Sequence, residues 1–276
     1  MEGRAVGLPH PSPAASPIPL VMRLAVWPVP PARALATALA DLVTEVVEVE
    51  PHEARAALDA GGVDLALVPT LDVLRAYTGL EVVPGIVLAG ERSPRRRLVV
   101  GSALDAIETI AFDPRDAQEA LLTQLVLREH YGSAAAFALS DPARPLTEVL
   151  EGASAALVDY REAVPAGAFV LDPGQEWTDL TLRPYPWGLL AALEGTLDAV
   201  AGLRLRAAAQ EAPVSEGLFH DGVGAYQLTL DGYATDGLDE LTEYLFQTGT
   251  LSEVPPIPFL ELPSDPDDDD DSDEDA

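Results

Sequence analysis

The 276-residue chain contains neither cysteine nor lysine. Without cysteine it can form neither a disulfide framework nor a thiolate metal site. All 16 basic residues are arginine, which excludes a Schiff-base lysine and the lysine of a Walker phosphate loop. Aromatic residues make up only 6% of the chain. No apolar run is long enough to cross a membrane as a helix.

Negative charge is what the chain has in excess. It holds 46 Asp and Glu residues against 16 arginines, for a net charge of -30. Nine of these acids lie in residues 264–276, so the other residues still carry a net charge of -21. A surface this acidic repels nucleic acid and anionic membranes, and we expect neither as a partner. The acidity fits either plain solubility or a halophilic adaptation to a salt-rich cytoplasm, where salt screens the self-repulsion.

Both ends of the chain are predicted to be disordered. Residues 1–21 contain five prolines and lack the continuous apolar stretch of a secretory signal. Because Met22 stands directly before the first apolar run, these residues are either a disordered leader or the result of a start assigned too far upstream. Residues 263–276 form a charged acidic tail. We expect a cytoplasmic protein.

Short apolar runs alternate with helical patterns through residues 23–100, which favours a mostly parallel sheet. A second strand–helix series follows, with its best helical pattern over residues 114–131. We predict strands at 23–29, 45–49, 63–68, 81–88, 97–100, 109–112, 134–138, 155–158 and 168–171. We predict helices at 32–42, 52–60, 71–77 with Thr70 as N-cap, 114–131, 145–150, 189–201, 203–211, 214–227 and 236–248, and a polar loop around Glu176 and Trp177.

These elements predict an α/β fold of two domains with a central cleft. Residues 22–98 and 188–262 would form a discontinuous first domain, and residues 99–187 the second. The chain crosses between them near residues 97–102 and 183–190, which makes a hinge. Because open α/β sheets bind ligands at the carboxyl ends of their strands, the cleft is the predicted binding site.

One dense basic group interrupts the acidic sequence: Arg92, Arg95, Arg96 and Arg97. Guanidinium groups bind carboxylates or phosphates through two parallel hydrogen bonds. Strand alternation predicts that Arg95 and Arg97 share one face and that Arg96 lies on the other. Either at least one of these arginines faces the cleft, or the group is an exposed loop that pairs with neighbouring acids.

Three carboxylates are candidates for acid–base chemistry, namely Asp159, Glu119 and Glu176. That role needs a pKa raised by burial or by a nearby negative charge; the ordinary alternative is a solvated or helix-capping carboxylate. Asp159 stands out because it ends a buried strand. The histidines, at positions 10, 52, 130 and 220, lack the spacing of metal ligands, so no metal site is predicted. An aromatic group either walls a ligand pocket or packs between the domains: Trp177, Tyr185 and Trp187.

The stretch DPGQEWTDLTLRP at residues 172–184 resembles the DL-x-EEW-x-x-x-TGLP segment of the chorismate dehydratase family of the futalosine route to menaquinone. Other stretches resemble that family in the same order within residues 23–262: GGVDLALVPTLDVL (61–74), EALLTQLVLREHYG (119–132), EGASAALVDY (151–160) and GLDELTEYLFQTGTLSEVPPIPFLEL (237–262). The resemblance implies the fold of type II periplasmic binding proteins.

The residues that line the family's pocket are largely replaced in this chain. The family's Ser-Tyr-Leu-Asn-Thr-type segment corresponds to WPVPP at residues 27–31, which has no asparagine. Its Lys-Ser before the hinge strand falls on Arg96 and Arg97, and its anion-binding Thr-Ser falls on Gln118 and Glu119. Of the family's Gly-Asp after the buried strand, this chain keeps only the acid, Asp159. In the stretch that corresponds to TGLP, Leu182 replaces the glycine, and Thr181 and Pro184 are unchanged.

The resemblance implies a chorismate dehydratase-like protein of menaquinone biosynthesis. It would be a carbon–oxygen lyase that eliminates the enolpyruvyl group of chorismate as pyruvate, with no metal or organic cofactor. In this hypothesis Arg97 binds a carboxylate, Asp159 or Glu119 is the base, and the pocket is lined by Gln118, Thr181 and Tyr185. The alternative is a non-catalytic relative that binds or senses a small carboxylate. The absence of a signal peptide and of a lipobox cysteine argues against a transporter's solute receptor.

The position of Arg97 would separate these hypotheses. An enzyme needs a buried carboxylate within reach of Arg97 in the cleft, whereas a binder needs a pocket without one. Both hypotheses fail if Arg97 points to bulk solvent while Trp27 and Trp177 fill the cleft. The sequence leaves the oligomeric state open.

Overall fold

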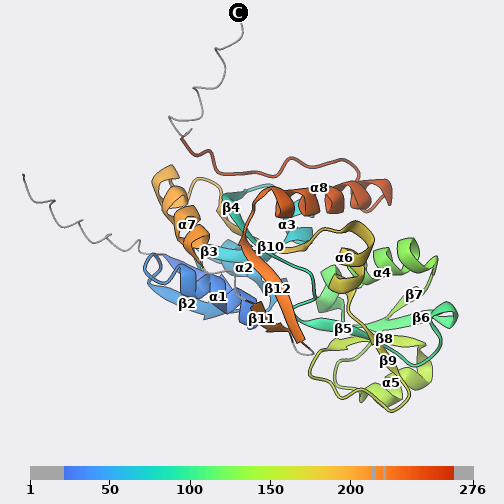
Figure 1. Ribbon diagram of the computed structural model, residues 1–276. Coiled ribbons are helices and arrows are strands. Elements are labelled where there is room, and N and C mark those ends of the chain that lie inside the picture. The colour runs from blue at the N-terminus through green and yellow to red at the C-terminus, as the bar shows by residue number, and fades with distance from the viewer. Residues whose placement is uncertain (1–21, 213–215, 220–221, 264–276) are drawn as a thin grey trace, which may run out of the picture.

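The chain folds into two lobes, each built around its own β-sheet (Figure 1). The structure is a computed structural model that describes residues 22–212, 216–219 and 222–263. The predicted disorder of residues 1–21 and of the tail from residue 264 onward lies outside the described residues. No helix in the described part of the chain is long and apolar enough to cross a membrane.

The first lobe contains the seven-stranded sheet, with strand order β11-β12-β4-β10-β3-β1-β2. Its first segment comprises β1 (Arg23–Val26), α1 (Pro30–Ala38), β2 (Glu45–Glu48), η1 (Pro51–Glu53), α2 (Ala54–Asp59), β3 (Leu65–Pro69), α3 (Thr70–Arg75) and β4 (Leu80–Gly90). The chain returns to it as β10 (Tyr185–Leu193), α7 (Ala199–Glu211), β11 (Glu216–Phe219), β12 (Gly222–Thr229) and α8 (Gly232–Gln247).

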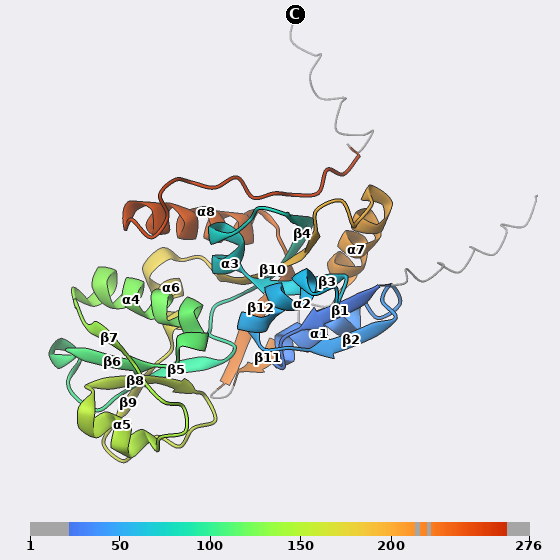
Figure 2. The ribbon, with the colours of Figure 1, turned by 180° about the vertical axis from the view of Figure 1, so that it is seen from behind.

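The second lobe contains the five-stranded sheet, with strand order β7-β6-β8-β5-β9. Its elements are β5 (Arg96–Val100), η2 (Leu104–Ala106), β6 (Thr109–Phe112), η3 (Pro114–Asp116), α4 (Ala117–Tyr131), β7 (Ala136–Leu139), α5 (Leu146–Gly152), β8 (Ala155–Asp159), β9 (Phe169–Leu171) and α6 (Pro173–Thr181). In both views α4 and α6 lie on the side of this sheet that faces the first lobe's α8, and α5 lies on the opposite side (Figures 1 and 2).

Both sheets are mixed. Strand β1 runs parallel to β2 and β3, and β6 runs parallel to β7 and β8. By contrast, β10 is antiparallel to β3 and β4, and β5 is antiparallel to β8 and β9. The predicted parallel arrangement therefore holds for strands joined by helical crossovers. It is wrong for the strands that receive the chain from the other lobe, because these enter the sheet in the reverse direction.

Several local predictions are wrong. Of the helix expected at 189–201, only residues 199–201 are helical and residues 189–193 belong to strand β10, while the helix expected at 214–227 is replaced by β11 and most of β12. Nearly all of β10 is buried, and a continuous apolar run is typical of both buried strands and buried helices. The expected polar loop is α6, which Asp172 caps by accepting from the N–H groups of Gly174 and Gln175. Thr70 is the first residue of α3 and not its N-cap.

The largest hydrophobic core is shared by the two lobes. It contains Trp27 from the first lobe together with Leu122 and Leu125 of α4 and Trp177 of α6. The indole Nε1 of Trp27 donates a hydrogen bond of 2.7 Å to the carbonyl of Leu67, so this buried polar group is satisfied. Close to the hinge, the lobes therefore meet through packed side chains.

Candidate functional site

Two chain crossings join the lobes, at residues 91–95 between β4 and β5 and at residues 182–184 between α6 and β10. The first crossing is tied to the start of α6, because Asp172 Oδ1 accepts a 2.8 Å hydrogen bond from the N–H of Ser93. A Cβ on Gly174 would lie 2.5 Å from the backbone of this crossing, so only glycine fits there. Burial raises the pKa of Asp172 to about 6, although its backbone N–H donors favour the ionised form.

An ionic network follows this crossing and lies between the lobes. We call Arg95, Arg96, Asp116, Glu119 and Asp159 the hinge cluster. Arg95 Nη2 is 2.9 Å from Asp116 Oδ1, and Arg95 Nε is 3.9 Å from Glu119 Oε1. Arg96 Nε is 2.7 Å from Asp116 Oδ2, and Arg96 Nη1 is 3.2 Å from Asp159 Oδ2. Asp116 thus joins two guanidinium groups, and the network runs from buried Glu119 to half-exposed Asp159.

Glu119 is the carboxylate at the inner end of the hinge cluster. It lies in the first turn of α4 and is 5% exposed. Burial raises the pKa of its carboxyl; the Arg95 guanidinium acts in the opposite direction, and the neighbouring Asp116 adds to the rise. A carboxylate with a raised pKa is a stronger base than a solvated one. The inner end of the cluster therefore holds a buried carboxylate with an increased proton affinity.

Arg95 also connects the hinge to the first lobe. Its Nη2 lies 3.5 Å from Glu50 Oε2, and the Arg95 side chain is almost wholly buried while that of Glu50 is half-exposed. Arg95 therefore faces carboxylates from both lobes. A cation in this position holds together acids that would otherwise repel one another.

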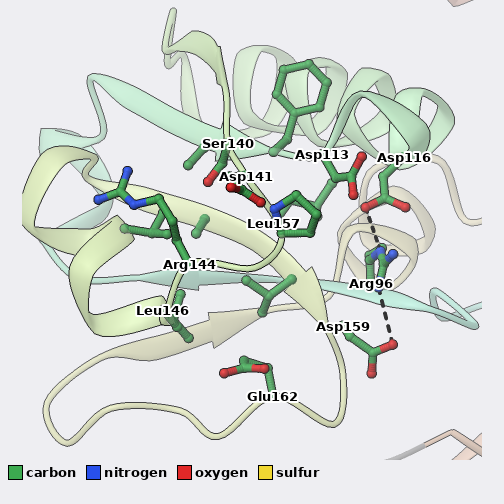
Figure 3. A pocket seen from close by; sticks show the side chains of 16 residues that line it. Arg96, Asp113, Asp116, Ser140, Asp141, Arg144, Leu146, Leu157, Asp159 and Glu162 are labelled. Carbon is green, nitrogen blue, oxygen red and sulfur yellow. Dashed lines mark hydrogen bonds and ion pairs between the residues drawn. The ribbon is translucent and has the colours of Figure 1, made fainter.

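A recess in the second lobe adjoins the outer end of the hinge cluster (Figure 3). We call it the outer recess. It has a volume of about 150 Å³, and its charged lining comprises Arg96, Asp113, Asp116, Asp141, Arg144, Asp159 and Glu162. In Figure 3 the guanidinium of Arg96 joins Asp116 to Asp159. The volume is below the roughly 300–1,000 Å³ of most small-molecule sites, so the recess has room for a small chemical group only.

The family model for menaquinone biosynthesis matches residues 22–214. The chain belongs to this menaquinone biosynthesis family. No curated protein matches the sequence.

Similar solved structures include protein AF1704 from Archaeoglobus fulgidus (14% identity, TM-score 0.56, covering 83% of this chain and 98% of that one). They also include the periplasmic aliphatic sulphonate binding protein SsuA from Escherichia coli (14% identity, TM-score 0.57, covering 86% of this chain and 95% of that one). A third is the alkanesulfonate-binding protein SsuA from Xanthomonas axonopodis pv. citri bound to MOPS (17% identity, TM-score 0.53, covering 88% of this chain and 98% of that one). These likenesses confirm the predicted type II periplasmic-binding-protein-like fold.

In this member of the menaquinone biosynthesis family, three residues predicted to line the pocket are engaged in internal contacts. Gln118 bonds across the lobes to the N–H of Leu71 and the carbonyl of Trp187. The hydroxyl of Thr181 donates to the Trp177 carbonyl one turn earlier in α6, at 2.9 Å. Tyr185 is buried, and burial together with nearby Glu119 raises the pKa of its hydroxyl.

The predicted carboxylate clamp, Arg97, lies apart from the base candidate Glu119. Its side chain is buried, and Nη2 donates a 2.6 Å hydrogen bond to the carbonyl of Glu162. Arg95 and Arg96 instead share the carboxylate of Asp116. We predicted that Arg95 and Arg97 share one face of the strand, and these contacts do not follow that pattern. Strand β5 begins only at Arg96, so strand alternation does not extend to Arg95.

Asp159, the second base candidate, ends β8 as predicted but has the contacts of a turn residue. Its side chain is 40% exposed, Oδ2 pairs with Arg96, and Oδ1 accepts from the N–H of Arg161 at 2.8 Å. These contacts hold the Asp159 carboxylate in place at the rim of the outer recess.

The aromatic group packs between the lobes, which was one of its two predicted roles. Trp177 and Tyr185 are in edge-to-face contact with ring centroids 5.6 Å apart, and Tyr185 and Trp187 have centroids 4.4 Å apart. Trp27 and Trp177 are both fully buried. The condition that would have excluded both functional hypotheses is not met, because Arg97 is buried and does not point to bulk solvent.

Glu176, the third carboxylate considered, belongs to a separate group at the far end of α4. Its Oε2 accepts a 2.5 Å hydrogen bond from the Tyr131 hydroxyl and lies 3.4 Å from His130 Nδ1. Burial, followed by this hydrogen bond, raises the pKa of Tyr131 to about 12. Glu119 lies in the first turn of α4, whereas Tyr131, the partner of Glu176, is the last residue of that helix. Glu119 and Glu176 are therefore too far apart to act together.

Near the hinge, sequence reasoning missed Asp116 and gave other roles to Arg95 and Thr70. Asp116 and Arg95 form the centre of the ionic network, and Thr70 is fully buried. Within the described part of the chain, Thr70 Oγ1 makes no hydrogen bond. The position of Thr70 directly after a buried strand was the one signal that could have found it. Among the described residues, no group of three His, Cys, Asp or Glu side chains could hold a metal ion.

Proposed function

We propose that this protein is a chorismate dehydratase of menaquinone biosynthesis in which Glu119 is the base. The observation that carries the proposal is a buried carboxylate with a raised pKa, 3.9 Å from the guanidinium of Arg95, between the two lobes. The criterion drawn from the sequence for an enzyme was a buried carboxylate within reach of Arg97. Arg97 instead contacts the carbonyl of Glu162, and the proposal therefore gives its role to Arg95.

The proposed reaction is an elimination that makes the ring aromatic. The base takes the proton from the ring carbon that bears the enolpyruvyl ether, and the electron pair of that C–H bond becomes a ring double bond. The C–O bond of the adjacent hydroxyl breaks, and the departing oxygen takes up a proton to leave as water. Because ether and hydroxyl lie on opposite ring faces, the proton and the leaving hydroxyl share a face. One carboxyl, Glu119, can therefore take the proton and return it.

Arg95 supplies the positive charge that this reaction needs. The ring carboxylate of chorismate is conjugated with the carbon that loses its proton, so negative charge spreads onto that carboxylate as the proton leaves. A buried guanidinium stabilises developing negative charge more strongly than an exposed one. The contact with Asp116 at 2.9 Å keeps the Arg95 side chain in one orientation.

Loss of pyruvate, the reaction first expected from the resemblance, is the competing elimination. It removes the proton from the carbon that bears the hydroxyl, expels enolpyruvate, and leaves 4-hydroxybenzoate. Dehydration is favoured because the carbanion at the ether-bearing carbon is conjugated with the ring carboxylate, where a guanidinium can stabilise it, whereas the carbanion at the hydroxyl-bearing carbon is not. The two reactions give different aromatic products, so one chromatographic assay separates them.

A second candidate function is a non-catalytic binder of a monoanionic carboxylate, which the charge balance of the site disfavours less than it disfavours a dicarboxylate. Arg95 and Arg96 face the carboxylates of Asp116, Glu119, Asp159 and Glu50. This surplus of acids weakens the attraction of the site for a dicarboxylate unless Glu119 holds a proton. A monoanionic ligand would be bound more readily than chorismate.

The test is incubation of the purified protein with chorismate at low and at high salt, with both possible aromatic products and pyruvate quantified. We expect the 3-enolpyruvyl benzoate, and we expect Glu119→Gln to lower its rate at least about 100-fold. Glu129→Gln is the matched control, because Glu129 is an exposed residue of the same helix. Full activity in Glu119→Gln would contradict the assigned base.

The outcome without turnover is also informative. If chorismate is not consumed but raises the melting temperature, the protein binds this ligand without converting it, and the second candidate function is supported. If only simpler monocarboxylates raise the melting temperature, the surplus of acidic side chains restricts the site to monoanionic ligands. Neither turnover nor a thermal shift with any of these compounds would refute both candidate functions.

A further inference from the structure

Gln118 crosses from one lobe to the other. It is the second residue of α4 in the second lobe, yet both ends of its carboxamide bond to the first lobe. Oε1 accepts a hydrogen bond of 3.0 Å from the N–H of Leu71, and Nε2 donates one of 2.8 Å to the carbonyl of Trp187. The side chain is buried, so water does not compete for these bonds.

The first lobe leaves the N–H of Leu71 without a helical partner. Leu71 is the second residue of α3, and the first N–H groups of any helix have no acceptor within the helix. They are usually satisfied by the side chain of an N-cap residue, but the N-cap of α3 is Pro69, which makes no such bond. Gln118 supplies the missing acceptor from the other lobe.

The carbonyl of Trp187 is available for a similar reason. The register between β10 and β4 shifts between Pro186 and Gly188, so that Trp187 has no partner in that ladder. A β-bulge of this kind leaves the extra residue outside the regular hydrogen-bond pattern. Gln118 therefore bonds to two backbone groups that the secondary structure of the first lobe leaves unpaired.

We propose that Gln118 is a latch that holds the two lobes closed without ligand and positions Glu119, the next residue of α4, between them. In a two-lobed binding fold, a bound ligand ordinarily bridges the lobes and favours the closed form. Here a side chain of the protein makes that bridge. The latch is inferred from the contacts of Gln118, which add to the packed core that the lobes share, and its effect on turnover rests on the proposed function.

The latch assigns Gln118 a different role from the ligand contact predicted from sequence. Both ends of its carboxamide are already engaged, and opening of the lobes has to break both bonds together. A ligand therefore enters when the latch opens. The relative stability of the latched form then controls how often the site is accessible.

The direct test uses Gln118→Leu, which keeps the approximate side-chain size and removes both bonds. Gln124→Leu is the matched control, because Gln124 is an exposed residue of the same helix. We expect hydrogen exchange at the Leu71 amide to accelerate at least about tenfold in the first variant, since that amide loses its acceptor. We also expect a larger radius of gyration by small-angle X-ray scattering. Unchanged Leu71 exchange and an unchanged radius would overturn the latch.

Amide exchange in β3 is measured in the same samples to show that the first lobe is still folded. If Gln118→Leu also loses protection in β3, Gln118→Asn takes its place, because it keeps the polarity and is too short to reach both partners. Retained Leu71 protection in that variant would equally overturn the latch. These measurements need no substrate, so they stand or fall independently of the proposed reaction.

Kinetics then separate a positioning residue from a ligand contact. With chorismate as substrate, we expect Gln118→Leu to lower kcat about tenfold or more while KM changes less than about threefold, because Glu119 is displaced and the ligand contacts remain. A rise in KM with an unchanged kcat would identify Gln118 as a ligand contact and overturn the positioning role. Gln124→Leu should behave as the wild type in both constants.

Discussion

The inner end of the hinge cluster and the outer recess contain the same kinds of side chain in different surroundings. Glu119 and Arg95 are almost completely buried, whereas Asp159 is 40% exposed and Arg144 lies at the surface. Burial raises the pKa of Glu119, while Asp159 contacts Arg96 and the backbone N–H of Arg161 near the surface. The difference teaches that in a chain with 46 acids the residue type carries little information, and that loss of solvent decides which acid can act as a base.

The largest expected effect tests this comparison through catalysis. Glu119→Gln should reduce dehydration of chorismate at least about 100-fold, since it removes the proposed base. Asp159→Asn should leave the rate nearly unchanged, because a half-exposed carboxylate at the recess contributes fixed charge only. Steady-state rates of both variants at saturating chorismate provide the measurement. A larger loss in Asp159→Asn than in Glu119→Gln would reverse the assignment of inner and outer end.

The next effect concerns stability. Arg95→Ala should lower the free energy of unfolding by about 3 kcal/mol or more, because it leaves buried Asp116 and Glu119 without their shared cation. Arg144→Ala should change it by less than about 0.5 kcal/mol, because Arg144 is exposed and its guanidinium donates to the carbonyl of Glu148, an acceptor that water can replace. Urea titrations with equal m-values would establish both numbers. Equal losses in the two variants would mean that burial does not distinguish the two regions.

A pH series sharpens the same comparison. Because burial raises the pKa of Glu119 above its unfolded value of about 4.3, the folded state binds more protons in the interval between the two pKa values. The stability contribution of Glu119 is therefore fully present below the unfolded pKa and is lost as pH rises through the folded pKa. We expect Glu119→Gln to gain melting temperature relative to the wild type as pH rises over this interval. Glu129→Gln should show no such trend, and a pH-independent difference for Glu119→Gln would refute the raised pKa.

The fold could be predicted where local signals agree with the tertiary structure. Alternating strands and helices over β1 to α3 and the long helix α4 follow from hydrophobic periodicity and turn residues. Strand β10 could not be identified in this way, because it is buried on both faces and its apolar run also fits a helix. Its position in the middle of the first sheet depends on pairing with β3 and β4, which are distant in sequence.

The candidate site could be predicted only in part. Glu119 was among the three candidate carboxylates, and its partner Arg95 was in the basic group, but the resemblance pointed to Arg97 as the clamp. Asp116 was missed because an acid in the stretch Asp-Pro-Arg-Asp is typical of a turn or helix start. Its role emerges from the approach of two guanidinium groups, at 2.9 and 2.7 Å, which no local sequence pattern encodes.

The smallest expected effect concerns the second crossing between the lobes, at Leu182. Leu182 ends α6 in the left-handed conformation, with φ of 58°, and its side chain is 74% exposed. A side chain in this conformation is strained and here gains little from burial, so Leu182→Gly should raise the free energy of unfolding by about 0.5–1 kcal/mol. Leu139→Gly is the matched control, because Leu139 is as exposed but lies in strand β7, where glycine is destabilising. Melting temperatures should therefore rise for the first variant and fall for the second. A fall in both would show that Leu182 stabilises the crossing through contacts that outweigh its backbone strain.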